Sequence, residues 1–176
     1  MKTYQFKNLL FEYFYSKFIE NYPEFTGKVF RERLKINKPE YPYLIMKSGE
    51  RTRINKRFEK FRKNDIDYVR ASYRISVNFS VHVLEEKPLQ AEMLADEAAD
   101  FIEEIFLDRE STHVDLRNSG IVINEDLCSG IRDKSEFSKT AQEFIRDINI
   151  IFEFEHVKTE SSEPAKEIET NVVFKK

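Results

Sequence analysis

The chain has 176 residues, of which 40% are hydrophobic and 35% charged, and its formal net charge is −3. This composition is typical of a folded, strongly solvated protein of one domain and excludes an intrinsically disordered chain. The four glycines lie too far apart to form a dinucleotide-binding fingerprint or a phosphate-binding P-loop. The single cysteine, Cys128, excludes an internal disulfide and any metal site built from several cysteines.

No uninterrupted apolar stretch is long enough to cross a bilayer, and no apolar secretory core begins the sequence. The lone cysteine fits a reducing compartment. We therefore expect a protein that is made and assembled in a cytoplasm, with no membrane partner. Because the net charge is too small to indicate a partner, the distribution of charge along the chain is more informative.

Residues 5–22 are predicted to form a helix that ends at Pro23, with two nearly opposite apolar stripes. The stripe expected to face the core consists of Phe6, Leu9, Leu10, Tyr13 and Phe14. The second stripe consists of Phe11, Tyr15, Phe18 and Tyr22. Either another subunit covers this second stripe, which makes it a subunit interface, or the helix is fully internal.

Short extended segments are expected around 28–34 and 41–47, and a basic segment follows them. Eight basic residues and two acidic ones give residues 47–63 a local charge of +6. Its apolar residues are only Ile54, Phe58 and Phe61. We interpret residues 47–66 as a basic excursion from the domain, in the form of a loop with one or two amphipathic turns.

The clearest element is a strand over 69–83, where apolar odd-numbered residues alternate with polar even-numbered ones. This period of two predicts one buried face and one wet or interfacial face. The strand over 69–83 is longer than most strands, so we expect it to bend or to project past the domain as half of a hairpin. Pro88 suits the first turn of a helix to about Asp108, whose outer face is acidic and which contains no lysine or arginine.

A short strand is expected at 120–124, a loop or irregular connection at 126–140 and a last core strand at 146–157. The sequence therefore predicts a single α+β domain over residues 1–157, with a mixed or antiparallel β-sheet, a long hairpin strand and two main packing helices. Residues 158–176 are predicted to form a C-terminal arm that is flexible or adds a strand, because a Ser/Glu/Pro-rich stretch leads to a β-prone tip at 170–174.

The histidines and the cysteine form no catalytic or metal-binding pattern in the sequence. His82, His113 and His156 are not spaced as metal ligands, and His82 and His156, which lie on predicted strands, are interpreted as surface or interface residues. Cys128 could pair with a histidine as a nucleophile, but no local motif supports this. We predict no catalytic residue, metal or cofactor, and a small enzyme is the least favoured class.

The remaining interface predictions concern the basic excursion and the acidic face of the helix that begins at Pro88. The acidic helix face is either solvated or meets a basic partner, and opposite patches on one chain favour head-to-tail packing of identical subunits in a ring. The alternative is a nucleic-acid-binding accessory protein that uses the basic residues and aromatics of 47–63. The predicted interface residues are Arg51, Arg53, Lys56, Arg57, Lys60, Arg62 and Lys63 in the excursion and Glu92, Asp96, Asp100 and Glu103 on the helix.

The order of the elements resembles that of a known family. The strand SYRISVNFSVHVLEE leads through Pro88 into the helix QAEMLADEAADFIEEIF, and GIVINED, SGIRD and QEFIRDINIIFEFEH follow. Over about residues 41–157 this arrangement resembles the tail terminator, or neck terminator, proteins of long-tailed bacteriophages, which complete tails and join them to heads. The basic excursion and the C-terminal arm depart from the common core.

The resemblance implies a structural virion protein that forms a ring, a hexamer in this family, at the head-proximal end of the tail. Such a ring ends assembly of the tail tube and joins the tail to the head connector. The implied partners are further copies of the chain, the tail tube protein and the head-completion or connector protein, with non-specific contact to passing DNA. The family has no catalytic residues, and the implied location is the tail or neck of the virion.

Overall fold

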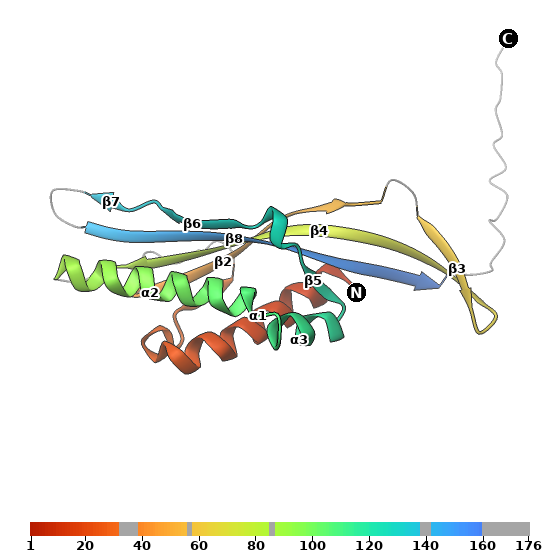
Figure 1. Cartoon of the computed structure of the whole chain (residues 1–176), viewed down its shortest axis with the longest axis horizontal. Coiled ribbons are helices and arrows are strands. Elements are labelled where there is room, and N and C mark those ends of the chain that lie inside the picture. The colour runs from red at the N-terminus through yellow and green to blue at the C-terminus, as the bar shows by residue number, and fades with distance from the viewer. Residues whose placement is uncertain (32–38, 56–57, 85–86, 138–141, 160–176) are drawn as a thin grey trace, which may run out of the picture.

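The computed structural model describes residues 1–31, 39–55, 58–84, 87–137 and 142–159. The interface predictions for Lys56 and Arg57, and the prediction of a flexible or strand-adding arm for residues 160–176, lie outside these residues. The described part is an α+β fold, as the sequence predicts, with a mixed sheet and its helices packed on one face (Figure 1). No helix in the described residues is long and apolar enough to cross a membrane.

The helices are α1 (Thr3–Asn21), α2 (Pro88–Leu107) and α3 (Thr112–Asn118), with 3₁₀ turns η1 (Pro23–Phe25) and η2 (Glu125–Leu127). The strands are β1 (Val29–Arg31), β2 (Tyr43–Arg53), β3 (Glu59–Lys63), β4 (Ile66–Val83), β5 (Ile121–Ile123), β6 (Ser129–Asp133), β7 (Glu136–Phe137) and β8 (Gln142–Thr159). The main strand order is β1-β2-β4-β8-β5, while β3 pairs with β4 and both β6 and β7 pair with β8. The β1–β2 pair is parallel, and the other described pairs are antiparallel.

Strands β4 and β8 form the centre of the sheet, and each is 18 residues long. Their antiparallel register joins Tyr68 to Thr159 at one end and Val83 to Phe144 at the other. The predicted alternation in β4 is confirmed, because odd-numbered residues such as Val77 are buried while the even-numbered ones lie on the opposite face. Both strands are longer than the sequence pattern indicated.

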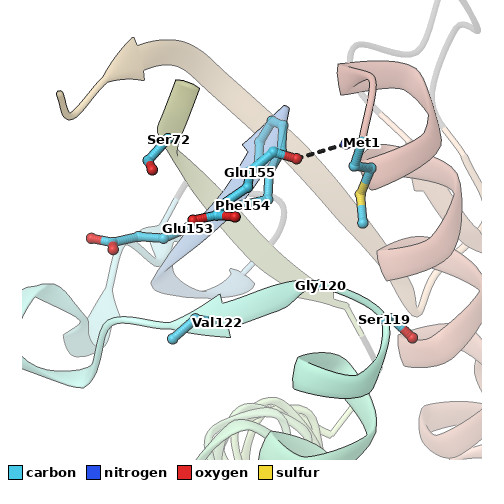
Figure 2. Close-up of a pocket in the computed structure, with 8 residues that line it drawn as sticks. All are labelled: Met1, Ser72, Ser119, Gly120, Val122, Glu153, Phe154 and Glu155. Carbon is cyan, nitrogen blue, oxygen red and sulfur yellow. Dashed lines mark hydrogen bonds between the residues drawn. The ribbon is translucent and has the colours of Figure 1, made fainter. Parts of the chain in front are cut away.

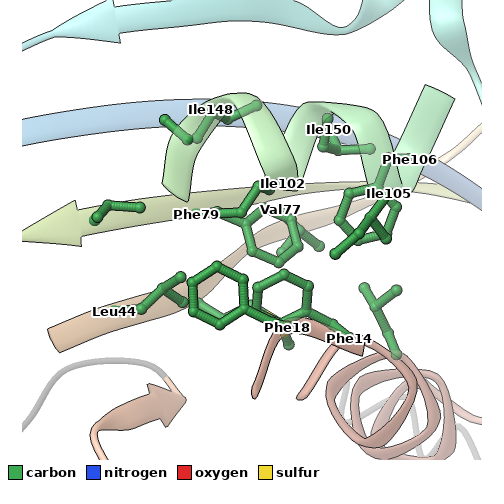
Figure 3. Close-up of a cluster of buried hydrophobic side chains, with 14 of the residues drawn as sticks. Phe14, Phe18, Leu44, Val77, Phe79, Ile102, Ile105, Phe106, Ile148 and Ile150 are labelled. Carbon is green, nitrogen blue, oxygen red and sulfur yellow. The ribbon is translucent and has the colours of Figure 1, made fainter. Parts of the chain in front are cut away.

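Helices α1 and α2 close one core over the apolar face of the sheet (Figure 3). Phe14 of α1 is fully buried there, and its ring centroid lies 4.8 Å from that of Phe79 in β4 and 6.1 Å from that of Phe106 in α2. Burying one such side chain stabilises a fold by roughly 1.5–3 kcal/mol. The two main helices that the sequence predicts are therefore confirmed as the packing layer.

Two predicted connections are corrected. The basic excursion is not a loop with amphipathic turns, because β2 runs on to Arg53 and β3 pairs with the first residues of β4. Asn64 and Asp65 join β3 to β4 with φ angles of 50° and 59°, the positive values that a tight two-residue hairpin turn requires. The connection at 126–140 contains the edge strands β6 and β7. Helix α3, which precedes β5, was not predicted from the sequence.

The long strands continue past the helices at one end of the molecule (Figure 1). We call this projecting end the β-extension and define it as residues 51–55, 58–71 and 155–159. It contains the end of β2, all of β3, the start of β4 and the end of β8. The N-terminal half of α2 lies at the other end of the sheet. The molecule is therefore elongated, with different elements at its two ends.

Candidate functional site

The arrangement most similar to a catalytic site lies on the sheet face away from the helices. Ser80 and His82, two residues apart on β4, project to the same side. The Nε2 atom of His82 lies 3.0 Å from Ser80 Oγ, and its Nδ1 atom lies 2.8 Å from Oε1 of Glu143 in β8. Sequence reasoning missed this grouping, because Glu143 is remote in the chain. Serine, histidine and carboxylate in this order match the composition of a nucleophilic triad.

The hydrogen bonds argue against an activated Ser80. The hydroxyl of Ser80 donates to Oδ1 of Asp147 at 2.5 Å, and a hydroxyl has a single proton to donate. The single hydroxyl proton of Ser80 therefore points to Asp147 and not to Nε2 of His82, whereas a nucleophilic serine must give this proton to its base. We interpret the group as a polar network that ties β4 to β8.

The stability of the protein in acid tests whether ionised Asp147 supports this network. Burial alone would raise the pKa of Asp147, but its hydrogen bonds with Lys134 and Ser80 outweigh burial and lower the pKa. Between the lowered pKa of folded Asp147 and its ordinary pKa in the unfolded chain, the unfolded chain binds more protons than the folded chain. The contribution of ionised Asp147 to stability is therefore complete above about pH 4, and it is lost as the pH falls through the lowered folded-state pKa. Urea unfolding between pH 7 and pH 3 should show this loss.

Asp147→Asn should remove that part of the acid dependence. The exposed Asp126 of η2 provides the matched control, Asp126→Asn. If Asp147→Asn and Asp126→Asn give the same pH profile as the unmodified chain, the network does not depend on ionised Asp147.

Cys128 and the other two histidines also have structural partners. Sγ of Cys128 donates to the backbone oxygen of Asn124 at 3.1 Å, and burial raises the pKa of the thiol, which lowers its nucleophilicity at neutral pH. Ring nitrogens of His113 and His156 contact backbone oxygens at 2.7 and 2.9 Å. Across the described residues, His, Cys, Asp and Glu side chains form no group of three that could hold a metal ion.

A pocket of about 360 Å³ lies where β5 meets β8 (Figure 2). Its lining residues are Met1, Ser72, Ser119, Gly120, Val122, Glu153, Phe154 and Glu155. The N-terminal ammonium of Met1 donates to the backbone oxygen of Glu155 at 2.6 Å, and Glu153 accepts hydrogen bonds from Arg74 and Asn124. The Met1 ammonium and the Glu153 carboxylate of the pocket thus have hydrogen-bond partners within the chain. None of the residues that line the pocket was predicted as an interface residue.

Five of the basic residues predicted from the sequence are described by the structure, and they lie on the β-extension. Arg51 lies over the ring of Tyr73 at 4.1 Å and donates to Thr3 of α1 at 3.0 Å. Arg53 lies over the ring of Phe58 at 4.9 Å. Arg51 and Arg53 are exposed, as are Lys60, Arg62 and Lys63 of β3.

Acidic residues within the β-extension neutralise part of this surface. Arg62 lies 3.7 and 3.8 Å from carboxylate oxygens of Asp65 and Asp67. Arg70, which the sequence analysis did not select, lies 2.5 Å from a carboxylate oxygen of Glu59. The surface is still basic, but less so than the sequence count of residues 47–63 indicates.

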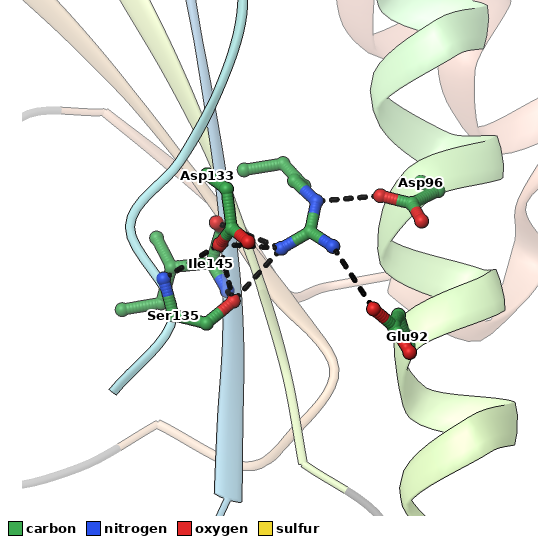
Figure 4. A network of polar contacts seen from close by, with 6 residues as sticks. Glu92, Asp96, Asp133, Ser135 and Ile145 are labelled. Atoms are coloured by element: carbon green, nitrogen blue, oxygen red, sulfur yellow. Dashed lines mark hydrogen bonds and ion pairs between the residues drawn. The ribbon is translucent and has the colours of Figure 1, made fainter. Parts of the chain in front are cut away.

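The acidic face of α2 is divided between internal and exposed groups. Nε of Arg146 in β8 lies 2.5 Å from Oδ1 of Asp96, and its Nη2 lies 3.9 Å from Oε1 of Glu92 (Figure 4). Asp96 and Glu92 therefore interact with a cation of the same chain, although the side chain of each is still 49% exposed. Asp100 is exposed and Glu103 is half-buried.

The aromatic stripe of α1 is also partly internal. Phe18 is fully buried and its ring stacks on that of Phe14 at 5.2 Å, so it belongs to the core and is not available to a partner. Phe11, Tyr15 and Tyr22 are half-buried and pack against the edge of the same core. Of the two alternatives for this stripe, the internal one holds for Phe18, while the other three residues keep some exposed surface.

Comparison with known proteins finds neither a family model nor a curated protein that matches this chain. The surfaces described above and the order of elements in the sequence are therefore the indications of its function.

Proposed function

We propose that this protein is a structural subunit of a phage tail, which forms a ring, of six copies, at the head-proximal end of the tail tube. The ring ends polymerisation of the tube and provides the surface on which the head connector docks. Its partners are further copies of the chain, the tail tube protein and the connector, in the tail or neck of the virion after assembly in the host cytoplasm. DNA passes through the ring and makes only non-specific contacts. No bond is made or broken, so the mechanism is one of shape and charge.

The observation that carries the proposal is the polarity of the elongated fold. The β-extension, with basic residues such as Lys60 and Lys63, lies at one end, while α2, whose exposed acidic residues include Glu97 and Asp100, lies in the other half of the molecule (Figure 1). Opposite charges on two different surfaces of one chain suit a heterologous, head-to-tail contact, and such contacts produce a ring when the rotation closes.

A pair of complementary charge reversals tests this contact. We expect Lys60→Glu with Lys63→Glu to prevent ring formation, because two acidic surfaces then face each other, which costs several kcal/mol. Glu97→Lys with Asp100→Lys should have the same effect through two basic surfaces. Native mass spectrometry at low salt reports the number of copies in each assembly.

Mixing the two variants distinguishes a contact from a folding defect. In a ring where the two variants alternate, the acidic β-extension of the first variant contacts the basic α2 face of the second. The unchanged β-extension of the second variant contacts the unchanged α2 face of the first. Rings with equal numbers of the two variants should therefore form. Arg117→Glu on α3, an exposed residue away from both surfaces, is the matched control and should leave assembly unchanged. Rings formed by either variant alone, or no rings in the mixture, would contradict the proposed contact.

One observation favours the alternative of a nucleic-acid-binding accessory protein. Phe58 is 56% exposed and lies beside Arg53, and exposed aromatics next to cations are a feature of surfaces that bind single strands. A gel shift with single-stranded DNA separates the two functions. Under this alternative, Lys60→Glu with Lys63→Glu weakens DNA binding by the monomer, while the α2 reversal does not.

A further inference from the structure

The helix-facing side of the β-extension carries a groove of about 440 Å³. Its lining residues are Arg51, Phe58, Val69, Ala71, Tyr73, His156, Lys158 and Thr159. Val69, Ala71 and Tyr73 are the odd-numbered residues of β4 that continue the core face of the sheet beyond the helices. The groove is therefore an extension of the core face over which none of the described helices lies (Figure 1).

The groove has an apolar floor and a basic rim. Phe58 exposes 56% of its surface, and covering such an apolar side chain is favourable because it removes apolar area from water. Arg51 forms one side of the rim, and Lys158 and His156 stand on β8 at the other. A segment that combines apolar and acidic residues would complement both parts.

The sequence that follows β8 has this composition. Strand β8 ends at Thr159, itself a lining residue, so the sequence of residues 160–176 follows directly from a residue of the groove. Residues 160–169 contain four glutamates and one lysine, and residues 172–174 are Val, Val and Phe. Ten residues of extended chain reach up to about 33 Å, which is long enough for the apolar tip to return over the groove.

We propose that the groove binds the C-terminal segment of its own chain. Val172 and Phe174 pack against Phe58 and the floor of β4, and the glutamates of residues 160–169 lie near Arg51 and Lys158. A short tether gives the segment an effective concentration in the millimolar range, which exceeds the concentration of a second copy at micromolar protein. The segment therefore covers the groove in each isolated copy, whether or not the protein forms a ring.

Competition with a free peptide tests this self-docking in the full-length chain. The probe is a fluorescently labelled peptide of residues 160–176, and fluorescence anisotropy measures its binding. The tip variant, Val172→Ser with Phe174→Ser, should release the groove without touching the core. If the free peptide binds with a Kd of about 0.1 mM, millimolar self-docking should make the unmodified chain bind it about tenfold more weakly than the tip variant does.

A second substitution in the tip variant locates the binding site. Phe58→Ser should abolish peptide binding, whereas Phe61→Ser should not, because the register places Phe61 on the opposite face of the same β-extension. Equal peptide affinity for the unmodified chain and the tip variant would show an open groove and overturn the proposal. Failure of the tip variant to bind the peptide would also overturn it. Self-association of the unmodified chain that the tip substitutions abolish would overturn it too, since the segment would then dock on a second copy.

Discussion

Phe14→Ala should lower the free energy of unfolding by about 4 kcal/mol, a large part of the stability of a domain of this size. Phe14 is fully buried, and its ring contacts those of Phe18 and Phe106 as well as Phe79 in the sheet. The substitution removes the transfer free energy of the ring and leaves a cavity between two helices and a sheet, which cannot collapse around it. Urea denaturation followed by circular dichroism measures the loss.

Tyr4→Ala is the matched control on the same helix, because Tyr4 is 58% exposed and the change should cost less than about 0.5 kcal/mol. Similar losses for Phe14→Ala and Tyr4→Ala would contradict a core closed by α1.

The elements with one buried face could be predicted from the sequence. The alternation through Ile75, Val77 and Phe79 and the helical stripe that contains Phe14 both reflect burial, which imposes a period on the residue types. Strand β3 has no such period, since all five of its residues are exposed and its pairing depends on the backbone of β4. The available signal was the turn formed by Asn64 and Asp65, residues that tolerate positive φ.

The candidate surfaces were predicted less completely, because charge counts do not show which groups meet across elements. The acidic helix has no cation of its own, but Arg146 reaches Asp96 from β8, 50 residues away in the chain. The sequence did contain a signal for this contact. Arg146 occupies the same alternation as the inward-facing Ile148 and Ile150, and an arginine on a buried face requires carboxylate partners. The apolar groove on the β-extension had no sequence signal, because it depends on where the helices stop.

Arg146→Ala should lower the free energy of unfolding by about 3 kcal/mol, the lower end of the range for breaking a buried ion pair. The side chain of Arg146 is only 6% exposed, and its Nη1 donates to Asp133 Oδ1 and to Ser135 Oγ, each at 2.8 Å, in addition to the contact with Asp96 (Figure 4). The three acidic partners lie nearer the surface, and without the guanidinium they face one another as like charges.

Removing a single carboxylate should lower the free energy of unfolding less than removing the guanidinium of Arg146. Glu92→Gln is expected to cost under about 1 kcal/mol, because the pair is long, half-exposed and screened, and Arg146 keeps its other acceptors. Arg146→Met should recover part of the loss of Arg146→Ala, since it restores packing and no longer buries a charge. Arg132→Ala, at an exposed position of β6, is the control for removal of an arginine near this site. If Arg146→Ala costs no more than Arg132→Ala in urea unfolding at low salt, the network does not stabilise the docking of α2 on β8.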